Sequence, residues 1–351
     1  MIRLIETKNV LIIGHFGGKN NFTDGQTVKT KILYEQLNKY TNWHIDILDT
    51  YYKKNKIAFL FNSLFKISKN KVIIVLLSGN GMKTFFPILF VFSKIFNKKV
   101  FHDVIGGNLH TYVDDEINFK KYLNSFCENW VETRGMAKLL NDRGIKNTRI
   151  IPNFRESEKI ELKVKKYANI FYFCTFSRVN KEKGISEAIL SIKKINEFHK
   201  GVCCYLDIYG PVDANYKEEF ENLISENQNY VSYKGNISQN KSISVLKKYD
   251  FLLFPTRWKG EGQAGTIIES FFAGLPVIAS DWMYNSEMVS HKVNGLIYPN
   301  TDINNLVDAI NWVINNDRSI NNMKQNALIE SSYYLPEKHI LKIKNIIEDF
   351  I

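Results

Sequence analysis

The sequence predicts an α/β protein made of two doubly wound halves, and three observations support that fold class. Short β-rich runs alternate with helical patterns through most of the chain, an arrangement typical of parallel sheets with helices on both faces. The alternation restarts after residue 166. A chain of 351 residues is also long enough to form two domains that each bury a core.

The first half contains five predicted strands and ends in a linker. The strands are expected at residues 10–13, 44–48, 72–77, 99–104 and 130–132. After Pro152-Asn153-Phe154, the charged stretch 155–166 shows little hydrophobic periodicity, so we interpret it as a connection between domains. The first domain is therefore expected to span residues 1–158.

The second half repeats the pattern of strands and helices. Strands are expected at residues 170–176, 205–209, 231–233, 251–254 and 277–279. Between the first two of these, isoleucines recur every three or four residues and form one apolar helical face, at Ile185, Ile189, Ile192 and Ile195.

We expect this second domain to span residues 167–334. Helical patterns return at residues 306–314 and 323–329, and after Pro336 a last helix over residues 335–351 is expected to pack back on the first domain. Two such domains are expected to face a central cleft and to bind ligands at the carboxyl ends of their strands.

Composition and cysteine usage exclude several other classes of protein. The 44% hydrophobic and 24% charged residues are typical of a folded globular chain. The four cysteines show no CxxC spacing, so neither a zinc site nor a disulfide framework is expected. No secretory signal pattern opens the chain, and the most apolar stretch, residues 85–96, is too short to cross a bilayer. A cytoplasmic location is therefore expected.

The formal net charge of +11 indicates attraction to anionic lipid or to phosphate. Lysines occur along the whole chain, and they mark no single element as a nucleic-acid reader, so no nucleic-acid partner is expected. Peripheral association with the inner face of an anionic membrane is one interpretation of this charge, and a well-solvated lysine-rich exterior is the other.

The most informative stretch covers residues 261–278 and places a glycine-containing loop between a strand and a helix. The amides of Gly265, Thr266 and Ile267 are expected at the helix start, where hydrogen bonds and the helix dipole stabilise a diphosphate. Apolar pairs four residues apart face the sheet, which leaves the carboxylate of Glu269 available to the hydroxyls of a ribose.

Glu261, in the loop before this helix, is expected to reach the sugar end of the same ligand. The helix start also has a purely structural interpretation. Thr266-Ile267-Ile268-Glu269 fits a capping box, in which threonine and glutamate satisfy the first amides of the helix reciprocally.

The spacing Glu-x7-Glu, followed by Ala-Gly-Leu-Pro-Val-Ile and Ser280-Asp281, resembles the signature of glycosyltransferase family 4, whose members share the GT-B fold. Relatives place the second glutamate on the nucleotide ribose and the first beside the donor sugar, so the resemblance implies these roles for Glu269 and Glu261. Many relatives carry Glu-Gly-Phe-Gly where this chain has Glu261-Gly262-Gln263-Ala264, a departure on the sugar side of the site. The specific motifs lie in residues 172–184 and 261–281.

A second segment, Phe176 to Gly184, resembles the family's Gly-Arg-Leu-x-x-x-Lys-Gly pattern. The guanidinium of Arg178 and the ammonium of Lys183 are expected to hold the donor phosphates and to stabilise the departing diphosphate. The alternative is a charged, solvated loop between a strand and a helix, which is how we interpret Lys181.

The first half offers weaker candidates, identified mainly by their place in the family's layout. Family members carry a comparable glycine-rich loop after the first strand, so the resemblance implies that Gly17 and Gly18 face the donor phosphate and the acceptor. A tight turn is the alternative.

Relatives often have a histidine after the fourth strand, which makes His102 a catalytic candidate and Asp103 and His110 acceptor-side candidates. For a histidine, hydrogen bonding within the protein is the alternative. Asn153 matches the end of the family's first domain and is expected to line the cleft.

The resemblance implies a retaining glycosyltransferase that moves a sugar from a nucleotide-sugar donor, with UDP expected because it is frequent in the family. The implied acceptor is a glycan or a lipid-linked saccharide in surface polysaccharide biosynthesis. Front-face transfer needs no nucleophilic side chain, and we expect no metal and no cofactor. Two other interpretations stay open: a non-catalytic nucleotide-binding partner in a polysaccharide-assembly complex, and a nucleotide-sugar epimerase of similar fold.

Overall fold

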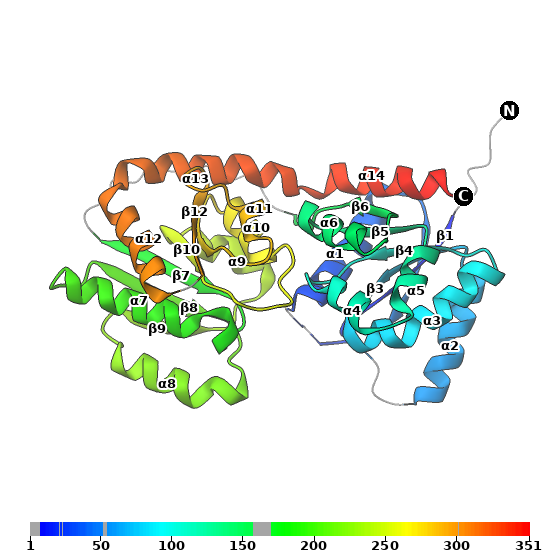
Figure 1. Cartoon of the computed structure of the whole chain (residues 1–351), viewed down its shortest axis with the longest axis horizontal. Coiled ribbons are helices and arrows are strands. Elements are labelled where there is room, and N and C mark those ends of the chain that lie inside the picture. Colours follow the sequence, from blue (N-terminus) through cyan, green and yellow to red (C-terminus); the bar gives the residue numbers. More distant parts are fainter. Residues whose placement is uncertain (1–7, 21, 23, 52–54, 157–169, 301) are drawn as a thin grey trace. The chain divides into compact units, whose positions relative to one another are not determined.

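The structure is a computed structural model that describes residues 8–351 apart from residues 21, 23, 52–54, 157–169 and 301. The chain forms two compact units (Figure 1). Unit 1 consists of Met1–Phe154 together with Leu335–Ile351, and unit 2 consists of Arg155–Tyr334. Most of the predicted linker lies outside the described residues.

Unit 1 is built on a parallel sheet of six strands in the order β2-β1-β3-β4-β5-β6. Its strands are β1 (Asn9–Gly14), β2 (His44–Asp49), β3 (Val72–Leu76), β4 (Lys99–Asp103), β5 (Glu128–Val131) and β6 (Thr148–Ile150). Its helices are α1 (Gly25–Tyr40), α2 (Lys56–Lys69), α3 (Gly79–Ile95), α4 (Leu109–Asp115), α5 (Phe119–Ser125), α6 (Arg134–Asp142) and α14 (Pro336–Asp349).

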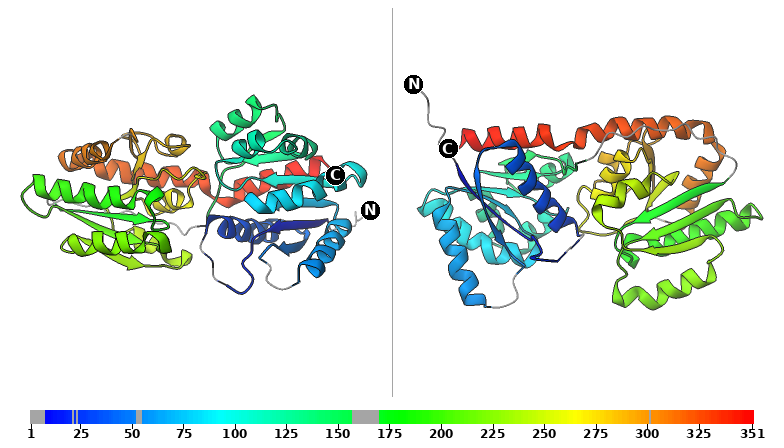
Figure 2. Two further views of the ribbon diagram at one scale, coloured as in Figure 1. Left: turned by 60° about the horizontal axis from the view of Figure 1, so that its bottom comes forward. Right: turned by 180° about the vertical axis from the view of Figure 1, so that it is seen from behind.

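Alternation along the strands of unit 1 divides its core between the two faces of the sheet. Phe101 packs with side chains of α1 and α14, including Leu33 and Ile340. The next residue, His102, points to the other face and contacts Phe86 of α3. Helices therefore cover both faces of this sheet (Figure 2), because each face of a buried parallel strand is apolar.

Unit 2 is built on a second parallel sheet of six strands, in the order β12-β11-β10-β7-β8-β9. Its strands are β7 (Phe171–Phe176), β8 (Cys204–Tyr209), β9 (Val231–Gly235), β10 (Phe251–Phe254), β11 (Val277–Ser280) and β12 (Gly295–Tyr298). Its α-helices are α7 (Ile185–Phe198), α8 (Lys217–Glu226), α9 (Gln239–Leu246), α10 (Gly265–Phe272), α11 (Asn285–Met288), α12 (Ile303–Asn315) and α13 (Asp317–Ser331).

The same alternation separates two cores in unit 2. Phe173 packs with Ile189 of α7 and Ile310 of α12 on one face of the sheet. Cys174, the next residue, packs with Ile267 and other side chains of α10 on the opposite face. Short 3-10 helices at Lys181–Lys183, Ala214–Tyr216 and Ser332–Tyr334 complete the described elements.

The predicted α/β class and the ten predicted strands are confirmed, and two strands were missed. Both missed strands, β6 and β12, have a single strand neighbour and are three and four residues long. β6 has one apolar residue, and β12, although apolar, has only four residues, so neither is long enough to show the period of a strand. Within the described part of the chain, no helix is both long and apolar enough to span a bilayer.

Candidate active site

The strand order of unit 2 brings two of the predicted motifs together. β7 and β10 are paired neighbours, with Phe251 opposite Phe173. β8 and β9 extend the sheet on one side of this pair, and β11 and β12 extend it on the other, so the direction of winding reverses here. Open α/β sheets bind ligands at the carboxyl ends of the strands at such a switch point. The loops after β7 and β10 therefore define the candidate site.

These two loops are in direct contact. The backbone N–H of Arg257 donates to the carbonyl of Glu182 over 2.6 Å. Gly184 has a positive φ of 71°, and a Cβ at this position would lie 2.2 Å from the carbonyl oxygen of Pro255. Only glycine allows this conformation and this approach, so Gly184 fixes how closely the loops meet.

Lys183 and Glu261, one from each loop, form an ion pair. The Nζ atom of Lys183 lies 2.5 Å from Oε2 of Glu261, and the hydroxyl of Thr256 donates to the same oxygen over 2.9 Å. Both side chains are largely buried. The pair thus places a cation and a hydrogen-bond acceptor at the switch point, the two groups that recognition of a phosphate and a sugar hydroxyl requires.

Arg178 lies in the same loop as Lys183 but has a different partner. Its Nε atom is 3.7 Å from Oδ1 of Asp213, in the segment after β8, and about half of the side chain is exposed. Within the described residues, no hydrogen bond or ion pair joins Arg178 to Lys183, Glu261 or Glu269. The guanidinium is therefore at the carboxyl edge of the sheet and free to turn toward a ligand.

Helix α10 begins without a side-chain cap. Its N-cap residue is Ala264, which has no polar side-chain atom, and Thr266 lies inside the helix, so the capping-box interpretation is wrong. The amide of Ile267 donates to the carbonyl of Ala264 over 3.1 Å, so this amide is not available to a phosphate. The amides of Gly265 and Thr266 have no hydrogen-bond partner among the described residues. They supply the donors that an anion at a helix start needs.

Glu269, one turn into α10, lies beside Arg155. Its Oε1 atom is 3.5 Å from Nε of Arg155. Burial raises the pKa of Glu269, while the nearby Arg155 and a hydrogen bond with Ser242 of α9 act in the opposite direction. The carboxylate is therefore oriented by two neighbours before any ligand is considered.

Arg155 is a site residue that the sequence analysis missed. It is 4% exposed, and a Cβ on Gly265 would lie 2.2 Å from its Nη2 atom. The guanidinium therefore occupies the space that the missing side chain of Gly265 leaves open at the start of α10. Its sequence signal was hidden because Arg155 opens the charged stretch that we interpreted as a linker.

In unit 1, the glycine-rich loop after β1 is held by a carboxylate of the protein. Asp49, at the end of β2, accepts hydrogen bonds from the amide of Phe16 over 2.9 Å and from the amide of Gly18 over 2.7 Å. Gly17 and Gly18 both have positive φ. The amide of Gly18 is thus committed to Asp49 in this structure, and a phosphate would have to displace that carboxylate.

His102 is enclosed in the core of unit 1. It is fully buried, its Nδ1 atom lies 3.2 Å from Oδ1 of Asn129, and its ring packs against Phe86 and Phe126. Burial lowers the pKa of His102 to about 3, so the ring is neutral. A side chain without exposed atoms offers no direct contact to a sugar, and we therefore do not carry His102 forward as a catalytic residue.

Asp103 belongs to a buried cluster of charges. Its Oδ1 atom lies 2.7 Å from Nζ of Lys29, which also contacts a Glu132 oxygen at 2.9 Å. Burial alone would lower the pKa of Lys29, but the two carboxylates raise it, so the lysine is charged. This arrangement ties α1 to the ends of β4 and β5.

The two remaining candidates of unit 1 lie on other elements. His110 is in α4 and partly exposed, and both burial and the neighbouring Arg143 lower its pKa. Asn153 follows β6 and is buried. No hydrogen bond or ion pair links His110 to His102 or Asp103 within the described chain.

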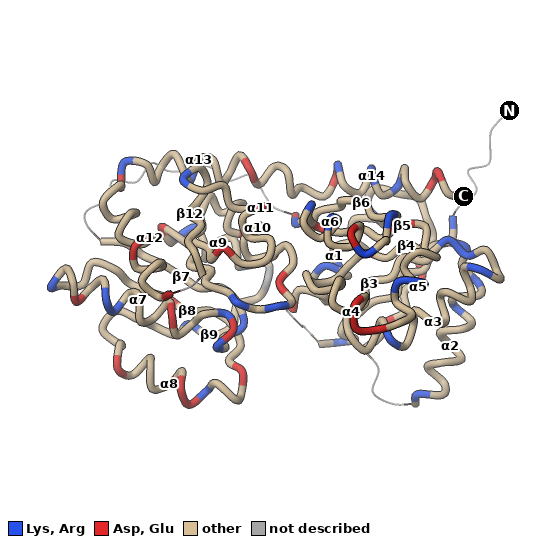
Figure 3. Tube along the Cα trace, viewed as in Figure 1, with Lys and Arg blue, Asp and Glu red and all other residues tan. Residues whose placement is uncertain are grey.

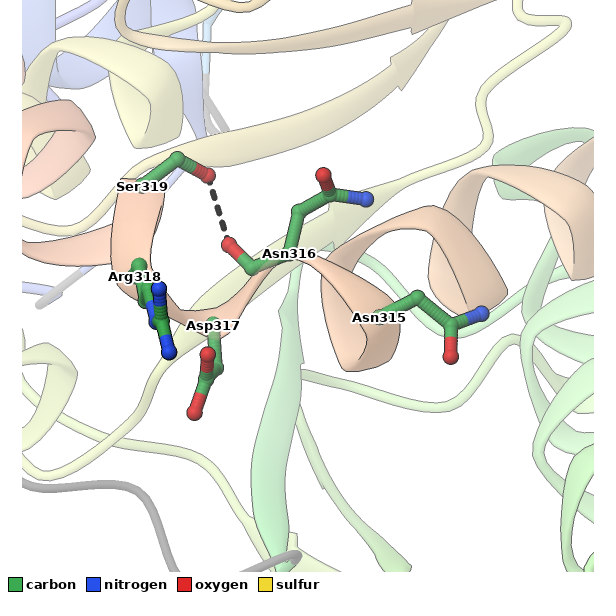
Figure 4. Close-up of a pocket in the computed structure, with 5 residues that line it drawn as sticks. All are labelled: Asn315, Asn316, Asp317, Arg318 and Ser319. Atoms are coloured by element: carbon green, nitrogen blue, oxygen red, sulfur yellow. Dashed lines mark hydrogen bonds between the residues drawn. The ribbon is translucent and has the colours of Figure 1, made fainter.

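The described residues offer no rival site of two other kinds, a metal centre or a second pocket. They contain no group of three or more histidine, cysteine, aspartate or glutamate side chains placed to hold a metal ion. A surface hollow at the junction of α12 and α13 is lined by residues 315–319 (Figure 4). These five residues are consecutive, so no groups from different elements converge there, and the hollow is no rival to the switch point.

The family model described as "Glycosyl transferases group 1" matches residues 134–329 of this chain. The poly(ribitol-phosphate) alpha-N-acetylglucosaminyltransferase of Staphylococcus aureus is 28% identical over 284 residues, which cover 75% of this chain and 53% of that protein. The chain spans about half the length of the first curated relatives it matches.

Solved structures share the fold over nearly the whole chain. Sucrose-phosphate synthase from Thermosynechococcus elongatus has a TM-score of 0.74 at 15% identity, over 97% of this chain and 98% of that one. The Anabaena HepE structure in complex with UDP-glucose has a TM-score of 0.74 at 13% identity, over 97% and 99% of the two chains. The predicted GT-B fold is thereby confirmed. Because the family model covers more than half of the sequence, this chain belongs to the glycosyl transferases group 1 family.

Proposed function

We propose that this protein is a retaining, metal-independent glycosyltransferase that uses a UDP-sugar and adds the sugar to a saccharide or lipid-linked saccharide acceptor. The observation that carries the proposal is the Lys183–Glu261 ion pair beside the uncapped start of α10. Lysine, two unpartnered amides and a carboxylate thus meet at the switch point of the sheet, within the residues that match the family model.

Each group has a role in this proposal. The amides of Gly265 and Thr266 and the ammonium of Lys183 bind the diphosphate, with Arg178 turning toward it from the exposed loop. Glu269 accepts hydrogen bonds from the ribose hydroxyls, and Glu261 accepts one from the donor sugar. Arrival of the diphosphate gives Lys183 a second anionic partner, which frees Glu261 for the sugar.

The transfer step needs no nucleophilic side chain. The bond between the anomeric carbon and the diphosphate oxygen breaks, and the acceptor oxygen bonds to the same face of that carbon. The proton of the acceptor passes to the departing diphosphate oxygen. Positive charge around the diphosphate stabilises the leaving group, so catalysis rests on positioning and electrostatics.

The acceptor is proposed from the relatives and from unit 1. One relative is named for transfer to poly(ribitol-phosphate) and another as an alpha-monoglucosyldiacylglycerol synthase, so both glycan and lipid acceptors occur among similar proteins. His110, Asn153 and the loop of Gly17 and Gly18 remain the acceptor-side candidates, whereas Asp103 is as buried as His102 and is bound to Lys29. A role in surface polysaccharide biosynthesis on the cytoplasmic side of a membrane fits these chemistries.

A thermal-shift screen of sugar donors tests the proposed donor site. UDP-, GDP- and ADP-sugars are added to the purified protein, and a ligand that binds only the folded state raises the melting temperature. A UDP-sugar is expected to raise it, and Glu269→Ala is expected to abolish the shift. If no nucleotide sugar stabilises the protein, or if Glu269→Ala leaves the shift unchanged, the assigned donor site is wrong.

A further inference from the structure

Lysines occur along the whole chain, but most of the net positive charge comes from one segment that lacks acidic residues. Residues 50–102 contain ten lysines and no aspartate or glutamate, although acidic residues are common elsewhere. Figure 3 shows lysines and no acidic residue along α2, which lies within this segment. Most of the net charge of +11 therefore comes from this segment, and five of its lysines lie in the helices α2 and α3.

Helix α2 exposes an apolar stripe to solvent. Ile57, Phe61 and Phe65 follow one another at four-residue spacing and are 68%, 69% and 66% exposed. Leu60 lies beside them and is also exposed. The opposite side of the helix is the buried one, where Ser63 is almost inaccessible. Large aromatic side chains rarely stand in water in such a row without a partner.

The end of α3 also exposes apolar side chains. Ile95 is 72% exposed, and its neighbour Phe96 is exposed as well. Lys98, just after α3, donates a hydrogen bond from Nζ to the carbonyl of Ser68 near the end of α2. This bond holds the carboxyl ends of the two helices together, and Figures 1 and 2 show α2 and α3 side by side at the rim of unit 1.

Lysines flank the apolar side chains. Lys56 opens α2 and Lys94 lies in the last turn of α3, and both are exposed without an ion-pair partner among the described residues. Two other lysines of the segment are paired, Lys69 with Asp46 and Lys83 with Glu116. The surface therefore combines exposed aromatic and aliphatic groups with uncompensated positive charge.

We propose that the exposed face of α2 and the end of α3 form a docking surface for an anionic lipid bilayer. The phenylalanines enter the boundary between headgroups and acyl chains, while Lys56 and Lys94 contact lipid phosphates. Charge complementarity selects this occupant. A protein partner with an apolar contact would not require a segment without acidic residues, whereas anionic headgroups are attracted to lysines that have no acidic neighbour, such as Lys56 and Lys94.

Vesicle flotation with the full-length protein tests the proposal. The protein is mixed with vesicles of phosphatidylcholine alone or of phosphatidylcholine with an equal part of phosphatidylglycerol. The wild type is expected to float with the anionic vesicles, to lose binding in high salt, and to bind the neutral vesicles weakly. The double variant Phe61→Ser/Phe65→Ser is expected to bind the anionic vesicles about a hundredfold more weakly, because two aromatic groups no longer enter the bilayer.

A matched control removes two exposed apolar side chains from unit 2. Phe198 and Ile329 are 77% and 61% exposed, so Phe198→Ser/Ile329→Ser changes hydrophobicity to a similar extent at another place. This variant is expected to float like the wild type. Equal binding of both double variants, or no binding of the wild type to anionic vesicles, overturns the proposal.

The docking surface and the donor site can fail independently. The thermal shift with a UDP-sugar needs no vesicles, and both double variants are expected to retain it. It also reports that the variants are folded. If the Phe61→Ser/Phe65→Ser protein is folded and binds the same anionic vesicles with unchanged strength, the surface does not dock on lipid, whatever the donor assay shows.

Discussion

The ammonium of Lys183 lies 2.5 Å from the carboxylate of Glu261, so two residues from motifs 78 positions apart form one ion pair. The contact exists because β7 and β10 are neighbours at the point where the sheet of unit 2 changes its winding direction. Each partner neutralises the charge of the other in this arrangement. Exchange of this pair for contacts with the diphosphate and the donor sugar is the event on which the proposed chemistry depends.

Removing the ammonium of Lys183 is expected to slow sugar transfer. Lys183→Ala should lower kcat/KM by about a hundredfold or more, since loss of one donor that stabilises a developing anion typically has that effect. Steady-state transfer assays at several donor concentrations measure the change.

Lys181 provides the matched control for that experiment, because it lies in the same 3-10 helix and is exposed. Lys181→Ala should leave kcat/KM within about twofold of the wild type. Equal losses in the two variants would mean that general positive charge in the loop matters and that the ion pair does not.

Arg155 is expected to act as a positioning residue through Glu269. Arg155→Lys keeps a charge but loses the planar fork, so Glu269 should be oriented less well toward the ribose. We expect a rise in KM for the donor of about tenfold and a kcat close to that of the wild type. A parallel loss of kcat would instead place Arg155 in the chemical step, and a merely structural role would lower the melting temperature without changing KM.

A side chain at position 265 should force Arg155 to move, because a Cβ there would lie 2.2 Å from Nη2 of Arg155. Gly265→Ala is expected to displace the guanidinium and weaken donor binding by about tenfold in calorimetry. Gly25 is a matched control, since it also opens a helix but a Cβ would meet nothing within 4 Å. Gly25→Ala should leave donor binding unchanged. If Gly265→Ala binds the donor as tightly as the wild type, the position of the Arg155 guanidinium does not matter for donor binding.

The buried His102 should make stability depend on pH. Its pKa is about 3 in the folded protein and 6.5 as a reference, so between these values the unfolded chain binds a proton that the folded chain does not. The free energy of unfolding contributed by this group is therefore complete above pH 6.5 and falls by about 1.4 kcal/mol per unit as the pH drops below it.

Urea unfolding at pH 5 and pH 7 of the wild type and of His102→Gln measures this contribution. Other groups titrate equally in both proteins, so the difference between the two pH slopes isolates the histidine. If His102→Gln shows the same pH dependence of the free energy of unfolding as the wild type, the ring of His102 is protonated or accessible in the folded state.

The sequence by itself determined the α/β class, ten of the twelve strands that the structure describes, and the candidate motifs. These features are local. Apolar runs define buried strands, and the spacing of glycines, glutamates and basic residues can be read directly from the sequence. The strands β6 and β12 were missed because three or four residues are too few to show the period of a strand.

Only the tertiary structure decided which candidates meet. Alternation along β4 turns His102 into the core, the end of β2 delivers Asp49 to the amide of Gly18, and Arg155 reaches the start of α10 from what the sequence suggested was a linker. Each of these contacts joins residues from separate elements, and their geometry follows from strand order and packing. Spacing along the chain does not contain that information.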